Sequence, residues 1–191
     1  MIKDGTKIMA ALLAVSLVLG GSTKADNTAS FGLVSSTLKE GAPMLNEQIL
    51  DSFGCTGRNQ SPGLRWTRPP TGTKSFAITL YDPDAPTGSG WWHWVVFDIP
   101  PGASELVAGA GDPAKKLLPA GCRQGRTDFG PPGYGGPCPP AGDQPHRYLF
   151  TVYALDIDKL GVSEAASPAM IGFVMHSHIL GKAVLQVTYG R

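Results

Sequence analysis

The sequence predicts a mainly β, mostly antiparallel domain, and three observations support that prediction. Several short segments rich in β-branched and aromatic residues alternate between apolar and polar positions, which is the pattern of half-buried strands. Loops rich in glycine and proline separate these segments, and the chain holds 25 glycines and 17 prolines. Only one segment has helical periodicity. At 191 residues, the chain has the length of one domain.

The strand predictions follow from local alternation. Residues 74–81 place Phe76, Ile78 and Leu80 on one face and smaller or more polar residues on the other. Further strands of the same character are predicted over residues 92–99, 146–155 and 183–189, with shorter ones over 31–35 and 64–66.

The helical segment lies near the end of the chain. Ser167 is a good N-cap, Pro168 suits the first helical position, and apolar residues recur at helical spacing after it. The pattern predicts a helix over residues 168–180 that ends at Gly181.

The charge balance argues against a nucleic-acid partner. Charged residues make up 16% of the chain and the formal net charge is +1. No strong positive field would therefore attract nucleic acid or an anionic membrane surface.

The N-terminus resembles a secretory signal peptide. Lys3 and Lys7 precede an apolar run over residues 8–21, and small residues follow around Ala25. The run is shorter than the roughly 20 residues that cross a bilayer, so we expect cleavage and no membrane span. The predicted organisation is a signal peptide over residues 1–25 and one domain over 26–191, with a periplasmic or secreted location.

Export makes the three cysteines, Cys55, Cys122 and Cys138, candidates for a disulfide. At most one intramolecular bond can form, and the sequence leaves three pairings open. We favour Cys55 bonded to Cys122 or to Cys138. No CxxC spacing indicates a redox motif or a zinc ribbon.

A first candidate site follows the strand predicted over residues 74–81. Asp82 and Asp84 stand in a proline-stiffened segment that ends with Pro86, which is also the composition of a plain strand-ending turn. A hairpin over residues 87–90 would bring His93 back beside Asp82. An imidazole, carboxylates and indoles together favour a small-ligand pocket, although a lone buried histidine is often only a core residue.

A glycine- and proline-rich loop provides the third part of this candidate site. Gly136 and Pro140 lie in the loop, and His146 and Tyr148 open the strand that follows. His146 and Tyr148 share one face because strand residues alternate, so Arg147 is expected on the opposite face in an ion pair. Backbone amides of such a loop can bind an anion.

Several of these motifs resemble the phosphatidylethanolamine-binding protein (PEBP) family. They are DPDAP at residues 82–86, WWHW at 91–94, GYGGPCPP at 133–140 and HRYLFTVYAL at 146–155. The segments FGCTGRNQSP at 53–62 and QGRTDFG at 124–130 are similar to its bacterial Raf kinase inhibitor-like branch, the YbhB/YbcL type. The motifs stand in the family's order and span nearly the whole predicted mature chain.

The resemblance implies a PEBP-like fold, in which a large antiparallel sheet packs on a smaller one with a few peripheral helices. It also implies a pocket for phosphate-like anions with Asp84 as a supporting carboxylate, formed by Asp82, Pro86, His93, Gly136, Pro140, His146 and Tyr148. Where animal members carry a second histidine before the pocket histidine, this chain has Trp92. Relatives of the bacterial branch are commonly dimers, so a homodimer is expected.

The function predicted from this reasoning is a non-enzymatic exported binding protein without a cofactor or metal. Its partner would be a phosphate-containing small molecule or a lipid head group, or a protein that it inhibits. A phosphate would accept hydrogen bonds from His93, His146, Tyr148 and loop amides. Asp82 would orient an imidazole and favour its charged form, or it would accept a hydrogen bond from a protonated ligand oxygen or an ammonium head group. The alternative is a metal-assisted or pocket-histidine hydrolase with zinc held by Asp82, Asp84, His93 and His146, although no HExxH pair is present.

Overall fold

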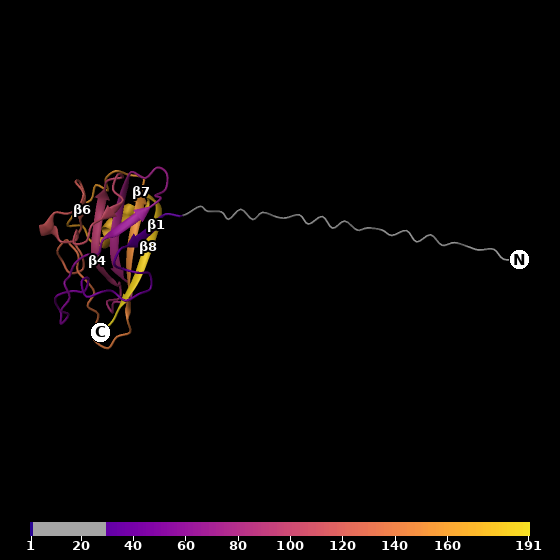
Figure 1. Ribbon diagram of the computed structural model, residues 1–191. Coiled ribbons are helices and arrows are strands. Elements are labelled where there is room, and N and C mark those ends of the chain that lie inside the picture. The colour runs from indigo at the N-terminus through magenta and orange to yellow at the C-terminus, as the bar shows by residue number, and fades with distance from the viewer. Residues whose placement is uncertain (2–29) are drawn as a thin grey trace.

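The computed structural model describes residue 1 and residues 30–191 (Figure 1). The predicted leader after its first residue and its cleavage site at Ala25 lie outside the described residues. Within the described part, no helix is long and apolar enough to cross a membrane.

Two antiparallel sheets form the fold. The larger sheet has five strands in the order β6-β4-β3-β7-β8, and the smaller has three in the order β1-β2-β5. The strands of the larger sheet are β3 (Ser75–Asp82), β4 (Trp91–Ile99), β6 (Arg123–Gln124), β7 (His146–Leu155) and β8 (Ile179–Tyr189). Those of the smaller sheet are β1 (Gly32–Ser35), β2 (Leu64–Thr67) and β5 (Glu105–Leu106). The predicted fold class is therefore confirmed.

The main core lies between the two sheets, because the alternating residues of β3 and β7 turn their apolar face toward β2. Phe76 of β3 packs on Trp66 of β2 with ring centroids 5.3 Å apart. Ile78 and Leu80 are completely buried in the same cluster. Burial of such side chains contributes about 1.5–3 kcal/mol each, which makes this cluster the main source of stability.

The helix is shorter than its periodicity predicts. It runs over α1 (Pro168–His176), and the side chain of Ser167 accepts a hydrogen bond from the amide of Met170, as expected of an N-cap. The prediction over residues 168–180 was wrong at its end, because β8 begins at Ile179 and pairs with β7. The bond between the His178 imidazole and Asp156, 2.8 Å long, holds the chain at this switch from helix to strand.

Three short elements were not predicted. They are β5, β6 and the 3₁₀ helix η1 (Pro113–Lys115), which is capped by the side chain of Asp112. Elements of two or three residues are too short to show a periodicity in the sequence.

Candidate functional site

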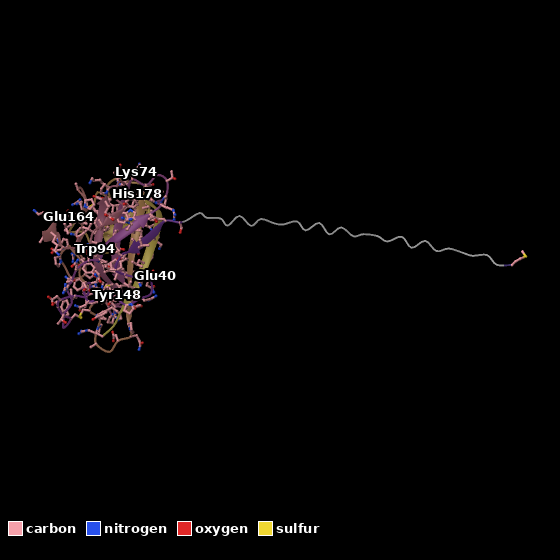
Figure 2. The ribbon with its side chains drawn as sticks, in the orientation of Figure 1. Glu40, Lys74, Trp94, Tyr148, Glu164 and His178 are labelled. Atoms are coloured by element: carbon pink, nitrogen blue, oxygen red, sulfur yellow. A yellow bond between two sulfur atoms is a disulfide. The ribbon has the colours of Figure 1, made fainter. Side chains whose placement is uncertain are left out.

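The candidate pocket lies at one end of the larger sheet. Because β3 is antiparallel to both of its neighbours, its last residue, Asp82, lies near the first residues of β4 and of β7. Tyr148 lies toward this end of the molecule, whereas Lys74 and His178 lie at the opposite end (Figure 2). The cavity here measures about 260 Å³. Its size suits a small ligand, since drug-sized sites occupy roughly 300–1,000 Å³.

Six of the eight sequence-predicted site residues line this cavity: Asp82, Pro86, His93, Pro140, His146 and Tyr148. The other two, Asp84 and Gly136, lie beside the cavity but not in its wall. Most of the remaining wall is apolar and comes from Leu50, Phe53, Ala85, Trp91, Phe129 and Pro139.

Asp82 and His146 form a buried pair at the base of the pocket. Oδ2 of Asp82 lies 2.8 Å from Nδ1 of His146, and both side chains are almost wholly buried. The other oxygen, Oδ1, accepts the backbone N–H groups of Asp84 and Ala85 at 2.8 and 3.0 Å. The carboxylate therefore fixes the turn after β3 and orients the imidazole, which is one of the two roles predicted for it.

Asp84 faces away from the pocket toward Arg147. Its carboxylate accepts hydrogen bonds from Nε and Nη2 of Arg147 at 2.9 and 2.7 Å, and from the Arg147 backbone amide at 2.8 Å. The bonds from the guanidinium hold the pKa of Asp84 at about 2. The ion pair expected of Arg147 is confirmed, and its partner is a residue that was predicted for the pocket. Asp84 ties the DPDAP turn to the start of β7.

His93 was expected to donate a hydrogen bond to the ligand, but the ring nitrogen left for a ligand, Nε2, is an acceptor. Its Nδ1 lies 2.7 Å from the carbonyl oxygen of Gly135, and because a carbonyl can only accept, Nδ1 carries the hydrogen. Burial lowers the pKa of His93 to about 4. The imidazole is thus neutral near pH 7, and Nε2 has a lone pair instead of a hydrogen.

Gly136 shapes the pocket from behind. Its amide donates to Oδ1 of Asn59 at 2.7 Å, and a side chain at this position would run into the backbone of residues 48–50. The glycine lets the 133–140 loop lie against that segment, whose Leu50 lines the cavity. Its role is close backbone packing, and its amide is already bonded.

Tyr148 places a hydroxyl group without a partner at the pocket. The side chain is completely buried, and the hydroxyl makes no hydrogen bond to any described residue. Burial, aided by the nearby Asp82 carboxylate, raises the pKa of Tyr148. The hydroxyl therefore keeps its hydrogen and can donate it to a ligand.

This geometry accompanies a clear relationship to known proteins. A family model for phosphatidylethanolamine-binding protein matches residues 38–190. The chain belongs to this family. It is 45% identical to the UPF0098 protein YbcL of Escherichia coli over 177 residues, which cover 93% of this chain and 97% of YbcL. It is 47% identical to YbhB of the same bacterium over 157 residues, 82% of this chain and 98% of YbhB.

Solved structures of the PEBP family agree with the fold. The crystal structure of E. coli YbcL superposes with a TM-score of 0.83 at 45% identity, covering 85% of this chain and 99% of that one. A PEBP homologue from Chlamydia trachomatis superposes with a TM-score of 0.71 at 31% identity, covering 85% and 98%. The large and small sheets of this chain are thus the PEBP fold.

Two phenylalanines at the mouth of this PEBP-family pocket, Phe53 and Phe129, were missed by the sequence reasoning. Phe53 is 71% exposed and stacks on Phe129 with ring centroids 6.3 Å apart, and Trp91 meets Phe129 edge to face. The indole N–H of Trp91 is buried without a partner among the described residues. Phe53 and Phe129 lie on loops, where no periodicity marks them. The available signal was their place in the FGCTGRNQSP and QGRTDFG segments.

A disulfide joins two walls of the mouth. It links Cys55, two residues after Phe53, to Cys138 of the loop that supplies Pro139 and Pro140, with the Cα atoms 6.0 Å apart. This is one of the two pairings that we favoured. Cys122 is a free thiol, and burial raises its pKa to about 11.

The zinc set considered for a hydrolase does not converge. Asp84 is bonded to Arg147, and Nδ1 of His93 to the Gly135 carbonyl. Among residues 30–191, no three histidine, cysteine, aspartate or glutamate side chains are grouped so that they could hold a metal ion.

Proposed function

We propose that this protein is a non-enzymatic binding protein whose pocket holds the phosphate group of a small molecule or a lipid head group. The observation that carries the proposal is the Asp82–His146 pair beside the unpartnered hydroxyl of Tyr148, in a cavity of about 260 Å³. A buried hydroxyl without a partner costs free energy, and a ligand oxygen would satisfy it. Membership of the PEBP family supports the same class of ligand.

The charge for anion binding would come from His146. No lysine or arginine lines the cavity in the described chain. Nδ1 of His146 lies 2.8 Å from Oδ2 of Asp82, and a protonated His146 would offer a ligand oxygen a charge-assisted donor. Nε2 of His146 also lies 3.5 Å from Oδ2 of Asp143, a half-exposed carboxylate at the rim. The pocket thus favours an anion of low charge.

The lining residues support binding rather than catalysis. Thr87 donates its hydroxyl to the Gly90 carbonyl at 2.5 Å, and Cys138 is in the disulfide. Within the described part of the chain, the cavity wall therefore has no hydroxyl or thiol that a neighbouring base activates as a nucleophile. The tyrosine hydroxyl holds its hydrogen too firmly for that role.

Titration with inorganic phosphate and phosphoethanolamine tests the proposal. We expect wild type to bind both and His146→Ala to bind at least about tenfold more weakly, because a charge-assisted hydrogen bond is lost. His178→Ala is the matched control, since this histidine also pairs with an aspartate but lies at the opposite end of the molecule (Figure 2). Native mass spectrometry of purified protein would reveal a ligand that co-purifies. No binding by wild type would overturn the proposal.

We further propose that the protein is exported to the periplasm or secreted. The support is the leader-like segment over residues 1–25 together with a disulfide, which persists in oxidising compartments. Mass spectrometry of the protein from the periplasmic fraction should give a mature chain that begins after Ala25. A chain that still carries residue 1 in the cytosol would contradict export. The homodimer and an inhibited protein partner stay predictions, the first checked by sedimentation.

A further inference from the structure

The pocket contains fixed hydrogen-bond acceptors as well as donors. Nε2 of His93 is an acceptor, because Nδ1 gives its hydrogen to the Gly135 carbonyl 2.7 Å away. His93 is 3% exposed and lines the cavity, and the hydrogen bond of its ring to Gly135 runs from Nδ1. A ligand oxygen facing this lone pair must bring a hydrogen of its own.

The tautomer of His93 is well determined. The bond to the Gly135 carbonyl is buried, so exchanging the hydrogen between the two ring nitrogens would place two lone pairs in contact. Burial lowers the pKa of His93 to about 4, so the second hydrogen is absent at moderately acidic pH. Tyr148 offers a hydroxyl donor in the same cavity, and Asp82 adds a negative charge at its base. This arrangement of a hydrogen-bond acceptor, a donor and a negative charge suits a singly charged phosphate that carries at least one unprotonated oxygen and one P–O–H group.

We propose that the pocket selects phosphomonoesters in their singly protonated form and rejects phosphodiesters, with Nε2 of His93 accepting the P–O–H hydrogen. The inference rests on the proposed function and narrows its ligand class. A monoprotonated monoester and a diester carry the same charge, but only the monoester has a hydrogen for His93. An intact phospholipid is a diester, whereas a free phosphorylated head group is a monoester.

The test compares monomethyl phosphate with dimethyl phosphate by calorimetric titration of the wild-type protein at pH 5.5. Both are mainly monoanions there, since the second pKa of a phosphomonoester is about 6. They differ by one methyl group, so charge and size are closely matched. We expect monomethyl phosphate to bind at least about tenfold more tightly, the value of one buried hydrogen bond to an ionic ligand.

Two variants assign the discrimination to His93. In His93→Phe the ring has a similar shape but no nitrogen that could accept a hydrogen bond, so the preference should fall to about twofold. Tyr148→Phe removes a donor and should weaken both ligands by a similar factor, leaving the preference intact. If a variant fails to fold, the comparison of monomethyl and dimethyl phosphate on the wild-type protein still tests the selection of monoesters.

Each outcome decides a separate claim. Equal binding of the two esters by wild type overturns the selection of monoesters and leaves the proposed function standing. A monoester preference that persists in a folded His93→Phe protein overturns the role of His93. If wild type binds neither ester nor inorganic phosphate, the proposed function falls and this inference falls with it.

Discussion

Replacing both Cys55 and Cys138 by serine is expected to lower the free energy of unfolding by about 4 kcal/mol. The disulfide joins residues separated by 83 positions, and a cross-link over so long a loop removes much conformational freedom from the unfolded chain. In the native state it holds the Phe53 segment against the loop of Pro139 and Pro140. Urea unfolding followed by tryptophan fluorescence would measure the loss.

Cys122→Ser is the matched control for this prediction. Cys122 is partly buried but unbonded, so its replacement should change stability by less than about 1 kcal/mol. A double serine variant as stable as the control would show that the cross-link contributes nothing to folding. Reduction of wild type by dithiothreitol should reproduce the effect of the double variant.

In the double serine variant, the native arrangement of the pocket mouth should change little, although the free energy of unfolding falls. Arg191 ties the same two walls together, since its guanidinium donates to the Pro139 carbonyl at 2.7 Å and to the Gly54 carbonyl at 3.3 Å. This contact remains when the disulfide is absent. The disulfide therefore acts mainly on the unfolded state, and Arg191 acts on the native arrangement of the mouth.

The central strands could be predicted because burial on one face leaves a period of two in the sequence. Phe76, Ile78 and Leu80 show this pattern, and all three are buried. The end of α1 could not be predicted, since Ile179 continues the helical spacing of apolar residues. Pairing of Ile179 with Leu155 decides its conformation, and that contact joins segments distant in sequence.

The site residues could be predicted as a set, but not their roles. Asp82 and Asp84 stand two positions apart in one turn, yet Asp82 points to His146 and Asp84 to Arg147. The carbonyl of Gly135 determines the hydrogen-bonding role of His93. Every residue has a backbone carbonyl oxygen, so the sequence does not indicate which one contacts His93, and only the structure shows it.

Acidification should destabilise the protein through His93 by about 2–3 kcal/mol between pH 7.5 and pH 4.5. The pKa of His93 is lowered from 6.5 to about 4 in the folded protein, chiefly by burial. Between these values the unfolded chain binds a proton that the folded chain does not. Stability from this group is therefore fully present above pH 6.5 and is lost as the pH falls toward 4.

The effect is isolated by comparing wild type with His93→Gln at both pH values. Other groups titrate equally in the two proteins, so their contributions cancel in the difference. The advantage of wild type over the variant should shrink by about 2–3 kcal/mol on acidification, measured by urea unfolding. Parallel pH profiles would mean that folding does not lower the pKa of His93, so that most of the imidazole is protonated at pH 5.5. Its Nε2 would then be a donor, and the physical basis for rejecting a phosphodiester would disappear.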